Sequence, residues 1–144
     1  MKPFKLQIIF GLILLIIGFT FDFTFVQTQM SRAFKNDPVS YLNSFSKQLY
    51  DLTKFYMLGL GLINITLALL GLHLRNQPKL DWTICGLMLI GSILVIVTGF
   101  WYAKAGPSFK WELRCTVLTI GLFSILLGLV LEIYKSVSGT SAKK

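Results

Sequence analysis

Four long apolar stretches dominate the pattern of hydrophobic and polar positions along this chain. They cover residues 6–26, 55–74, 83–103 and 113–134. A helix rises about 1.5 Å per residue, so about 20 apolar residues cross a hydrocarbon core about 30 Å thick. The pattern therefore predicts an all-α integral membrane protein, a four-helix transmembrane bundle that runs up-down-up-down.

The segment between the first two spans, residues 27–54, has the pattern of an amphipathic helix. Asp37 and Pro38 form a helix-start signature, an N-cap followed by proline at the first helical position. Apolar residues then recur every three or four positions, at Val39, Leu42, Phe45, Leu49, Leu52 and Tyr56. We expect a helical first loop, continuous with the second span, that lies on the headgroups or projects from the membrane. The candidate partner-docking residues are Leu42, Phe45, Leu49 and Leu52.

Small residues recur within each span at a spacing of about seven, which keeps them on one helix face. Small side chains on such a face let two helix backbones approach closely. We therefore expect the following positions to face the bundle interior: Gly11, Gly18, Gly61, Ala68, Gly71, Cys85, Ser92, Gly99, Gly121, Ser124 and Gly128. Leu62 and Leu129 are expected to face lipid.

Three polar residues extend these faces and are the intramembrane candidates: Asp22, Asn64 and Glu132. Because an intramembrane charge costs about 2.5 kcal/mol or more, we expect all three to point inward. Asp22 is either a proton, ion or substrate site or the partner of an interfacial threonine or basic residue. Asn64 either joins helices or lines a polar path. Glu132, which neighbours Lys135, is expected in an interfacial salt bridge, and Arg75 is a possible partner.

Charge and cysteine content narrow the function classes. The net charge is +8, but the 14 basic residues divide evenly between the two predicted sides of the membrane. That distribution is typical of headgroup anchoring and argues against nucleic-acid binding. Cys85 and Cys115 open the third and fourth spans, so we expect free thiols near opposite membrane faces.

An even number of spans places both termini on one side of the membrane. Lys2 and Lys5 precede the first span, which usually dominates orientation, so both termini are expected in the cytoplasm. The first apolar run continues to Val26 without a small-x-small cleavage site, which predicts a retained helix rather than a signal peptide. We expect residues 1–144 to form a single membrane domain.

The chain shows no complete catalytic or metal-binding set. Catalysis needs a convergent nucleophile, base and stabiliser, and we expect no cofactor. His73, Asp81 and Cys85 are too mixed a set to predict a metal site. The leading hypothesis is a non-enzymatic subunit or assembly partner of a membrane complex, in contact with lipid and with a protein partner or further copies of itself. The alternatives are a small homo-oligomeric transporter or channel that uses Asp22 and Asn64, and a lipid-modifying membrane enzyme.

Overall fold

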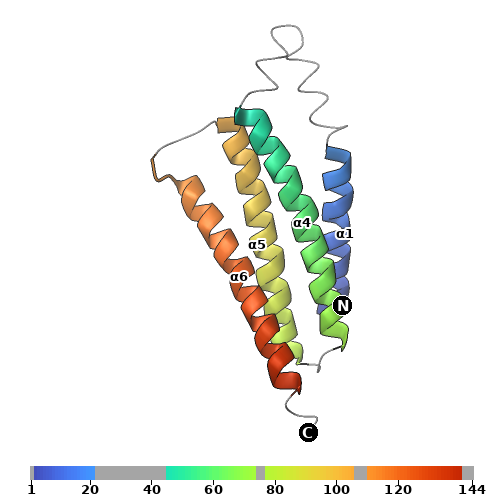
Figure 1. The fold of residues 1–144 in the computed structure, drawn as a ribbon. Helices are drawn as coiled ribbons and strands as arrows, with labels where there is room; N and C mark the ends of the chain where they lie inside the picture. Colours follow the sequence, from blue (N-terminus) through green and yellow to red (C-terminus); the bar gives the residue numbers. More distant parts are fainter. Residues whose placement is uncertain (1, 22–44, 74–76, 106–109, 141–144) are drawn as a thin grey trace.

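The structure, a computed structural model, describes residues 2–21, 45–73, 77–105 and 110–140. Within these ranges it contains four helices, α1 (Pro3–Phe21), α4 (Phe45–His73), α5 (Pro78–Ala105) and α6 (Leu113–Thr140), and no strand. All four helices are long and apolar enough to cross a membrane. They lie side by side in one bundle (Figure 1), which confirms the predicted all-α membrane fold.

The helices begin where the sequence supplies the usual signals. α1 and α5 begin at Pro3 and Pro78, and proline suits the first helical position because its missing N–H would have no partner there. In the first turn of α5, the Asp81 carboxylate accepts a hydrogen bond from the backbone N–H of Gln77 at 3.3 Å. An acid at this position also complements the helix dipole. The polar first turn of α5 thus precedes the apolar run. For this reason α5 begins at Pro78, whereas the predicted span begins at residue 83.

Helices that follow one another in the chain pack together: α1 on α4, α4 on α5 and α5 on α6, with α1 also in contact with α5. Two of these interfaces depend on facing glycines. A Cβ on Gly11 would lie 2.7 Å from the carbonyl oxygen of Gly61, and a Cβ on Gly91 would lie 2.8 Å from that of Gly121. Neither backbone could stay in place beside a larger residue.

The small residues that were expected to face inward do so. Nine of them are buried and two, Gly99 and Ser124, are partly buried. Gly91 also faces inward, at the contact between α5 and α6. Its burial was not predicted, because the seven-residue spacing in α5 selects the adjacent Ser92. Leu62 is 57% exposed, as expected. The lipid-facing assignment of Leu129 is wrong: this side chain is partly buried against the core, next to the buried Gly128.

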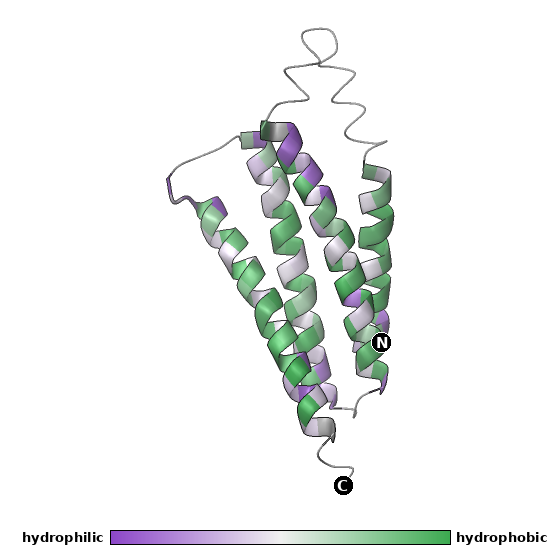
Figure 2. Ribbon diagram, in the orientation of Figure 1, coloured by the Kyte–Doolittle hydropathy of each residue, from purple (hydrophilic) through white to green (hydrophobic). Residues whose placement is uncertain are grey.

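Exposed aromatic residues mark two levels on α5 that match the thickness of a membrane. Trp82 and Trp101 are both exposed, and helix rise separates them by about 28 Å. Tryptophan concentrates at membrane interfaces about 30 Å apart. Figure 2 shows apolar residues along the helices between these levels and hydrophilic residues gathered toward the helix ends. We call the end with Trp82 the terminal end, because the first residues of α1 lie there, and the end with Trp101 the loop end.

The helical first loop is confirmed for the residues that the structure describes. α4 is one helix from Phe45 through the second predicted span to His73. It keeps a single axis (Figure 1), so its first turns do not lie flat on the headgroups. The predicted start at Asp37 and Pro38, and the candidate Leu42, lie outside the described residues.

The face of α4 that packs inward differs from the predicted stripe. Tyr50, Thr53 and Met57 are buried, whereas Leu52 and Tyr56 are exposed. The ring of Tyr50 lies 6.4 Å from that of Phe21 and 6.3 Å from that of Phe100, centroid to centroid. The hydroxyl of Thr53 donates to the Leu49 carbonyl oxygen at 2.7 Å. Thr53 can therefore be buried without leaving a hydrogen-bond donor unpaired.

Candidate functional site

A buried ion pair joins α5 to α6 at the terminal end. Lys135 Nζ lies 2.7 Å from Asp81 Oδ1, and the two side chains are 0% and 1% exposed. At this distance the opposite charges attract each other strongly. Such attraction is strong where water is excluded, and breaking the pair leaves an uncompensated charge.

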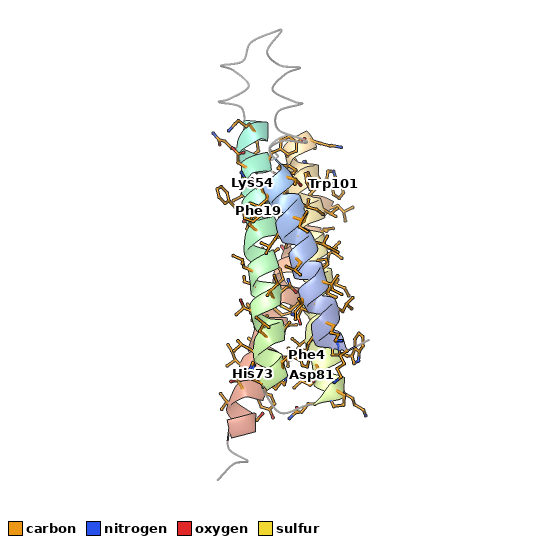
Figure 3. All side chains as sticks on the ribbon, turned by 90° about the vertical axis from the view of Figure 1, so that its right-hand side faces the viewer. Phe4, Phe19, Lys54, His73, Asp81 and Trp101 are labelled. Carbon is orange, nitrogen blue, oxygen red and sulfur yellow. The ribbon has the colours of Figure 1, made fainter. Side chains whose placement is uncertain are left out.

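The surroundings of the pair bring all four described helices together. The Phe4 ring of α1 lies under the ammonium of Lys135, with Nζ 5.0 Å from the ring centroid, a cation–π contact. On its other side Phe4 fills the space beside Gly71 of α4, where a Cβ would lie 2.2 Å from the ring. Figure 3 shows Phe4 and Asp81 next to each other at this end of the bundle.

A second carboxylate, that of Glu132, competes for the same ammonium. Glu132 Oε1 lies 3.9 Å from Lys135 Nζ, and the Glu132 side chain is 8% exposed. This distance exceeds that of a hydrogen bond, and Glu132 Oε1 has no hydrogen-bond partner among the described residues. The inward orientation expected for Glu132 is confirmed, and the basic group that it faces among the described residues is Lys135. Arg75 lies outside the described residues.

Asn64 joins two helices near the middle of the bundle. Its side chain is fully buried. The amide Nδ2 donates to the Leu60 carbonyl oxygen at 2.8 Å and to Ser92 Oγ of α5 at 3.2 Å, while Oδ1 has no partner among the described residues. Through Nδ2 Asn64 joins two helices, the first of the two roles expected for it, while the described residues leave Oδ1 available for the second role, the lining of a polar path.

Three polar residues of the site were not predicted as such: Gln7, Asp81 and Lys135. Gln7 of α1 is buried, and its Nε2 has no hydrogen-bond partner in the described part of the chain. The spacing that singled out the other candidates would have found all three. Gln7 precedes Gly11 by one turn, Asp81 precedes Cys85 by one turn, and Lys135 follows Gly128 by two turns.

The buried polar groups of the terminal half occupy successive levels. Asp81 lies in the first turn of α5, and Ser92, the partner of Asn64, lies about 16 Å further along the helix. Ser92 is also about halfway between Trp82 and Trp101. Besides the atoms of the ion pair, Glu132, Gln7 and Asn64 each have one buried atom without a hydrogen-bond partner in the described structure.

The remaining candidates stay apart from this site. Asp22 and Leu42 lie outside the described residues. Phe45 and Leu52 are exposed at the loop end of α4, and Leu49 is partly buried against the core. No group of three His, Cys, Asp or Glu side chains in the described ranges could hold a metal ion.

Cys85 and Cys115 are free thiols, as predicted. Cys85 Sγ donates to the Pro3 carbonyl oxygen at 3.5 Å near the terminal end. Cys115 Sγ lies 2.8 Å from the Tyr102 hydroxyl at the loop end. The structure thus places the two thiols at opposite ends of the bundle.

A membrane-impermeant maleimide should therefore discriminate between the two thiols. With both termini in the cytoplasm, as expected from the sequence, the reagent applied to right-side-out vesicles should label the partly buried Cys115 and leave the buried Cys85 unmodified, as measured by mass spectrometry of the intact chain. Detergent denaturation should make both thiols reactive. Labelling of both thiols in intact vesicles, or a Cys85–Cys115 disulfide under non-reducing conditions, would contradict their placement at opposite ends.

The described part of the chain therefore offers two features with functional potential, the apolar residues at the loop end of α4 and the buried charges at the terminal end. Both features are inferred from the geometry of the structure and not from similarity to known proteins. Comparisons of the chain with protein-family models, with curated proteins and with solved structures give no match.

Proposed function

We propose that this chain is a non-enzymatic subunit or assembly partner of a membrane complex, and that the first turns of α4 bind its protein partner. The observation that supports this proposal is the pair Phe45 and Leu52, which are 45% and 44% exposed on a helix that continues past the loop-end interface. Figure 3 places Lys54 at about the height of Trp101, so the turns that precede Lys54 lie beyond the tryptophan level.

The first turns of α4 are held rigidly, which suits a binding element. Tyr50 packs against Phe21 and Phe100, whose ring centroids lie 5.5 Å apart. Thr53 fits against Gly99 of α5, where a Cβ would lie 2.4 Å from the threonine hydroxyl. Because these contacts order the helix before any partner arrives, binding loses less conformational entropy.

The exposed side chains have the composition of a small interface. Complete burial of a Phe or Leu side chain contributes about 1.5–3 kcal/mol relative to its exposure to water. Phe45 and Leu52 are seven residues apart and so lie on one face of the helix, whereas the ion pair between Lys47 and Asp51, at 2.7 Å, lies on another face of the same turns.

We propose further that both termini face the cytoplasm. The four candidate spans support a multi-pass membrane protein, and Lys2 and Lys5 at the start of α1 favour the cytoplasmic side. In this orientation the first turns of α4 meet their partner on the opposite, non-cytoplasmic side.

The docking surface can be tested with two matched double variants of α4. Phe45→Ala with Leu52→Ala should weaken co-purification of the partner in mild detergent at least about tenfold, because interface anchors contribute about 1–2 kcal/mol each or more. The control is Leu62→Ala with Leu69→Ala, two exposed leucines in the membrane part of the same helix. Blue-native electrophoresis should show the complex for the control only. If both variants retain the complex, the first turns of α4 do not bind the partner.

A further inference from the structure

We propose that Glu132 is a proton-binding site reached from the terminal end of the bundle, and that Gln7 and Asn64 continue it as a hydrated polar path to the middle of the membrane. The ligand is a proton delivered by water. The proposal does not depend on the docking surface, which lies at the other end.

The first argument is the balance of charge around Lys135. One ammonium faces two carboxylates, so the cluster would carry a net charge of −1 if Asp81, Glu132 and Lys135 were all ionised. The distances are unequal: Asp81 Oδ1 lies 2.7 Å from Lys135 Nζ, and Glu132 Oε1 lies 3.9 Å from it. Asp81 therefore neutralises the ammonium, and Glu132 receives the weaker attraction.

The second argument is the cost of a buried carboxylate oxygen without a hydrogen bond. Glu132 Oε1 is buried and has no hydrogen-bond partner among the described residues. A buried charge that is neither well paired nor hydrogen-bonded is strongly disfavoured. A proton taken from water forms an O–H bond on the carboxylate and removes the charge.

Within residues 2–21, 45–73, 77–105 and 110–140, no other group at this level supplies a second positive charge to Glu132. On α5 the ionisable neighbours are Asp81 and the Cys85 thiol, which donates to a backbone oxygen. At this level α1 contributes Phe4 and Gln7, and α4 contributes Gly71 and Ala68.

Three further ionisable residues that the structure describes near the terminal end face outward. Lys5, Lys79 and His73 are exposed, and the His73 ring bonds the Leu69 carbonyl oxygen. Their charges are screened by the surrounding medium. Since Lys135 already stands between the two carboxylates as a cation, like-charge repulsion disfavours a metal ion, and the site suits a proton.

The third argument is the pair of orphaned atoms beyond Glu132. Gln7 Nε2 and Asn64 Oδ1 are both buried and have no hydrogen-bond partner in the described structure. Buried polar atoms that protein groups leave unpaired are commonly satisfied by ordered water. Gln7 Nε2 is a donor and Asn64 Oδ1 is an acceptor. Water molecules can bind to both atoms, because water donates hydrogen bonds as well as accepting them.

Infrared spectroscopy of the folded protein tests the proton site directly. At neutral pH the wild-type chain should show the C=O band of a protonated carboxylic acid, shifted in D₂O, and Glu132→Gln should lose this band. The control Glu112→Gln, at a partly exposed loop-end acid, should keep it. A spectrum without a difference between wild type and Glu132→Gln would overturn the proposal.

Stability provides a second readout on the same variant. Glutamine is a neutral isostere of protonated glutamic acid, so Glu132→Gln should keep the thermal unfolding midpoint within a few degrees of wild type. If Glu132 were instead ionised, the substitution would remove the excess negative charge beside the Asp81–Lys135 pair and shift the midpoint by more than a few degrees. A large change of the midpoint in either direction therefore also contradicts the proposal.

Radiolytic hydroxyl-radical footprinting tests the hydrated path with two buried methionines. Met88 lies one turn beyond Cys85 on α5, as Gln7 lies one turn beyond Pro3 on α1, and Cys85 and Pro3 are in contact. Met57 is equally buried but lies in the apolar core toward the loop end. Bound water near Gln7 should make Met88 oxidise several-fold faster than Met57, and Gln7→Leu should remove the difference. Equal rates in the wild-type chain would show that the path is dry.

Discussion

Lys135→Met should be among the most damaging single substitutions in this chain, with a loss of about 3–5 kcal/mol in the free energy of unfolding. The substitution removes the ammonium that faces both Asp81 and Glu132 and leaves two acids buried. Asp81→Asn should cost less, because Glu132 Oε1, 3.9 Å away, can then move toward the ammonium. Thermal unfolding in mild detergent would measure both effects.

A double variant separates the charge effect from general damage to the helix contact. Asp81→Leu with Lys135→Met replaces the pair by apolar side chains, and such replacements are often neutral or stabilising. The double variant should therefore be more stable than Lys135→Met alone. Lys79→Met, at an exposed lysine in the same turn of α5 as Asp81, is the control and should change stability little. A double variant as unstable as the single one would show that the pair is not a charge-coupled unit.

The location of the ion pair explains why its loss should be large. α6 packs on α5 along its length, and Figure 1 shows the two helices close at the terminal end and diverging toward the loop end. At the loop end a long side chain, Tyr102, spans the gap to Cys115. The pair thus joins the two helices at the end where they stay together, and its loss would leave buried acids in that part of the interface.

The membrane spans and the inward faces could be predicted from the sequence because lipid imposes simple rules. A lipid-exposed helix must be apolar over its whole length, so spans appear as uninterrupted runs. Close helix contacts in lipid need small residues, so the repeated glycines identify the interfaces. The same rule predicted the burial of Asn64 and Glu132, and it would have predicted that of Gln7 and Lys135.

Two features of the site could not be predicted, for different reasons. The identity of the ion pair depends on which residues of α5 and α6 face each other, and Lys135 is closer in sequence to Glu132 than to Asp81. Only the geometry shows that the more distant acid is the nearer neighbour. The buried face of α4 at the loop end depends on shape: the ring of Tyr50 packs against those of Phe21 and Phe100, while Leu52 remains exposed.

Tryptophan at the glycine contacts should separate the helices and destabilise the bundle. Gly61 of α4 and Gly121 of α6 each face a glycine of the neighbouring helix. A Cβ on Gly61 would lie 2.9 Å from the Gly11 carbonyl oxygen, and one on Gly121 would lie 3.2 Å from that of Gly91. Backbone atoms cannot rotate away, so an indole there forces the helices apart. We expect Gly61→Trp and Gly121→Trp each to lose about 3 kcal/mol or more, the upper part of the range for overpacking.

Leu62→Trp is the matched control for this prediction. Leu62 is adjacent to Gly61 on α4 but is 57% exposed, so an indole at this position should extend into lipid without contacting another helix. The variant should unfold within a few degrees of the wild-type midpoint in mild detergent, while the glycine variants unfold much earlier. Gly128→Trp provides an intermediate case, because a Cβ there would meet the flexible Met88 side chain, with Sδ at 2.9 Å, rather than backbone. If Leu62→Trp and Gly61→Trp were equally destabilising, the assignment of the glycine face to the α1–α4 contact would be wrong.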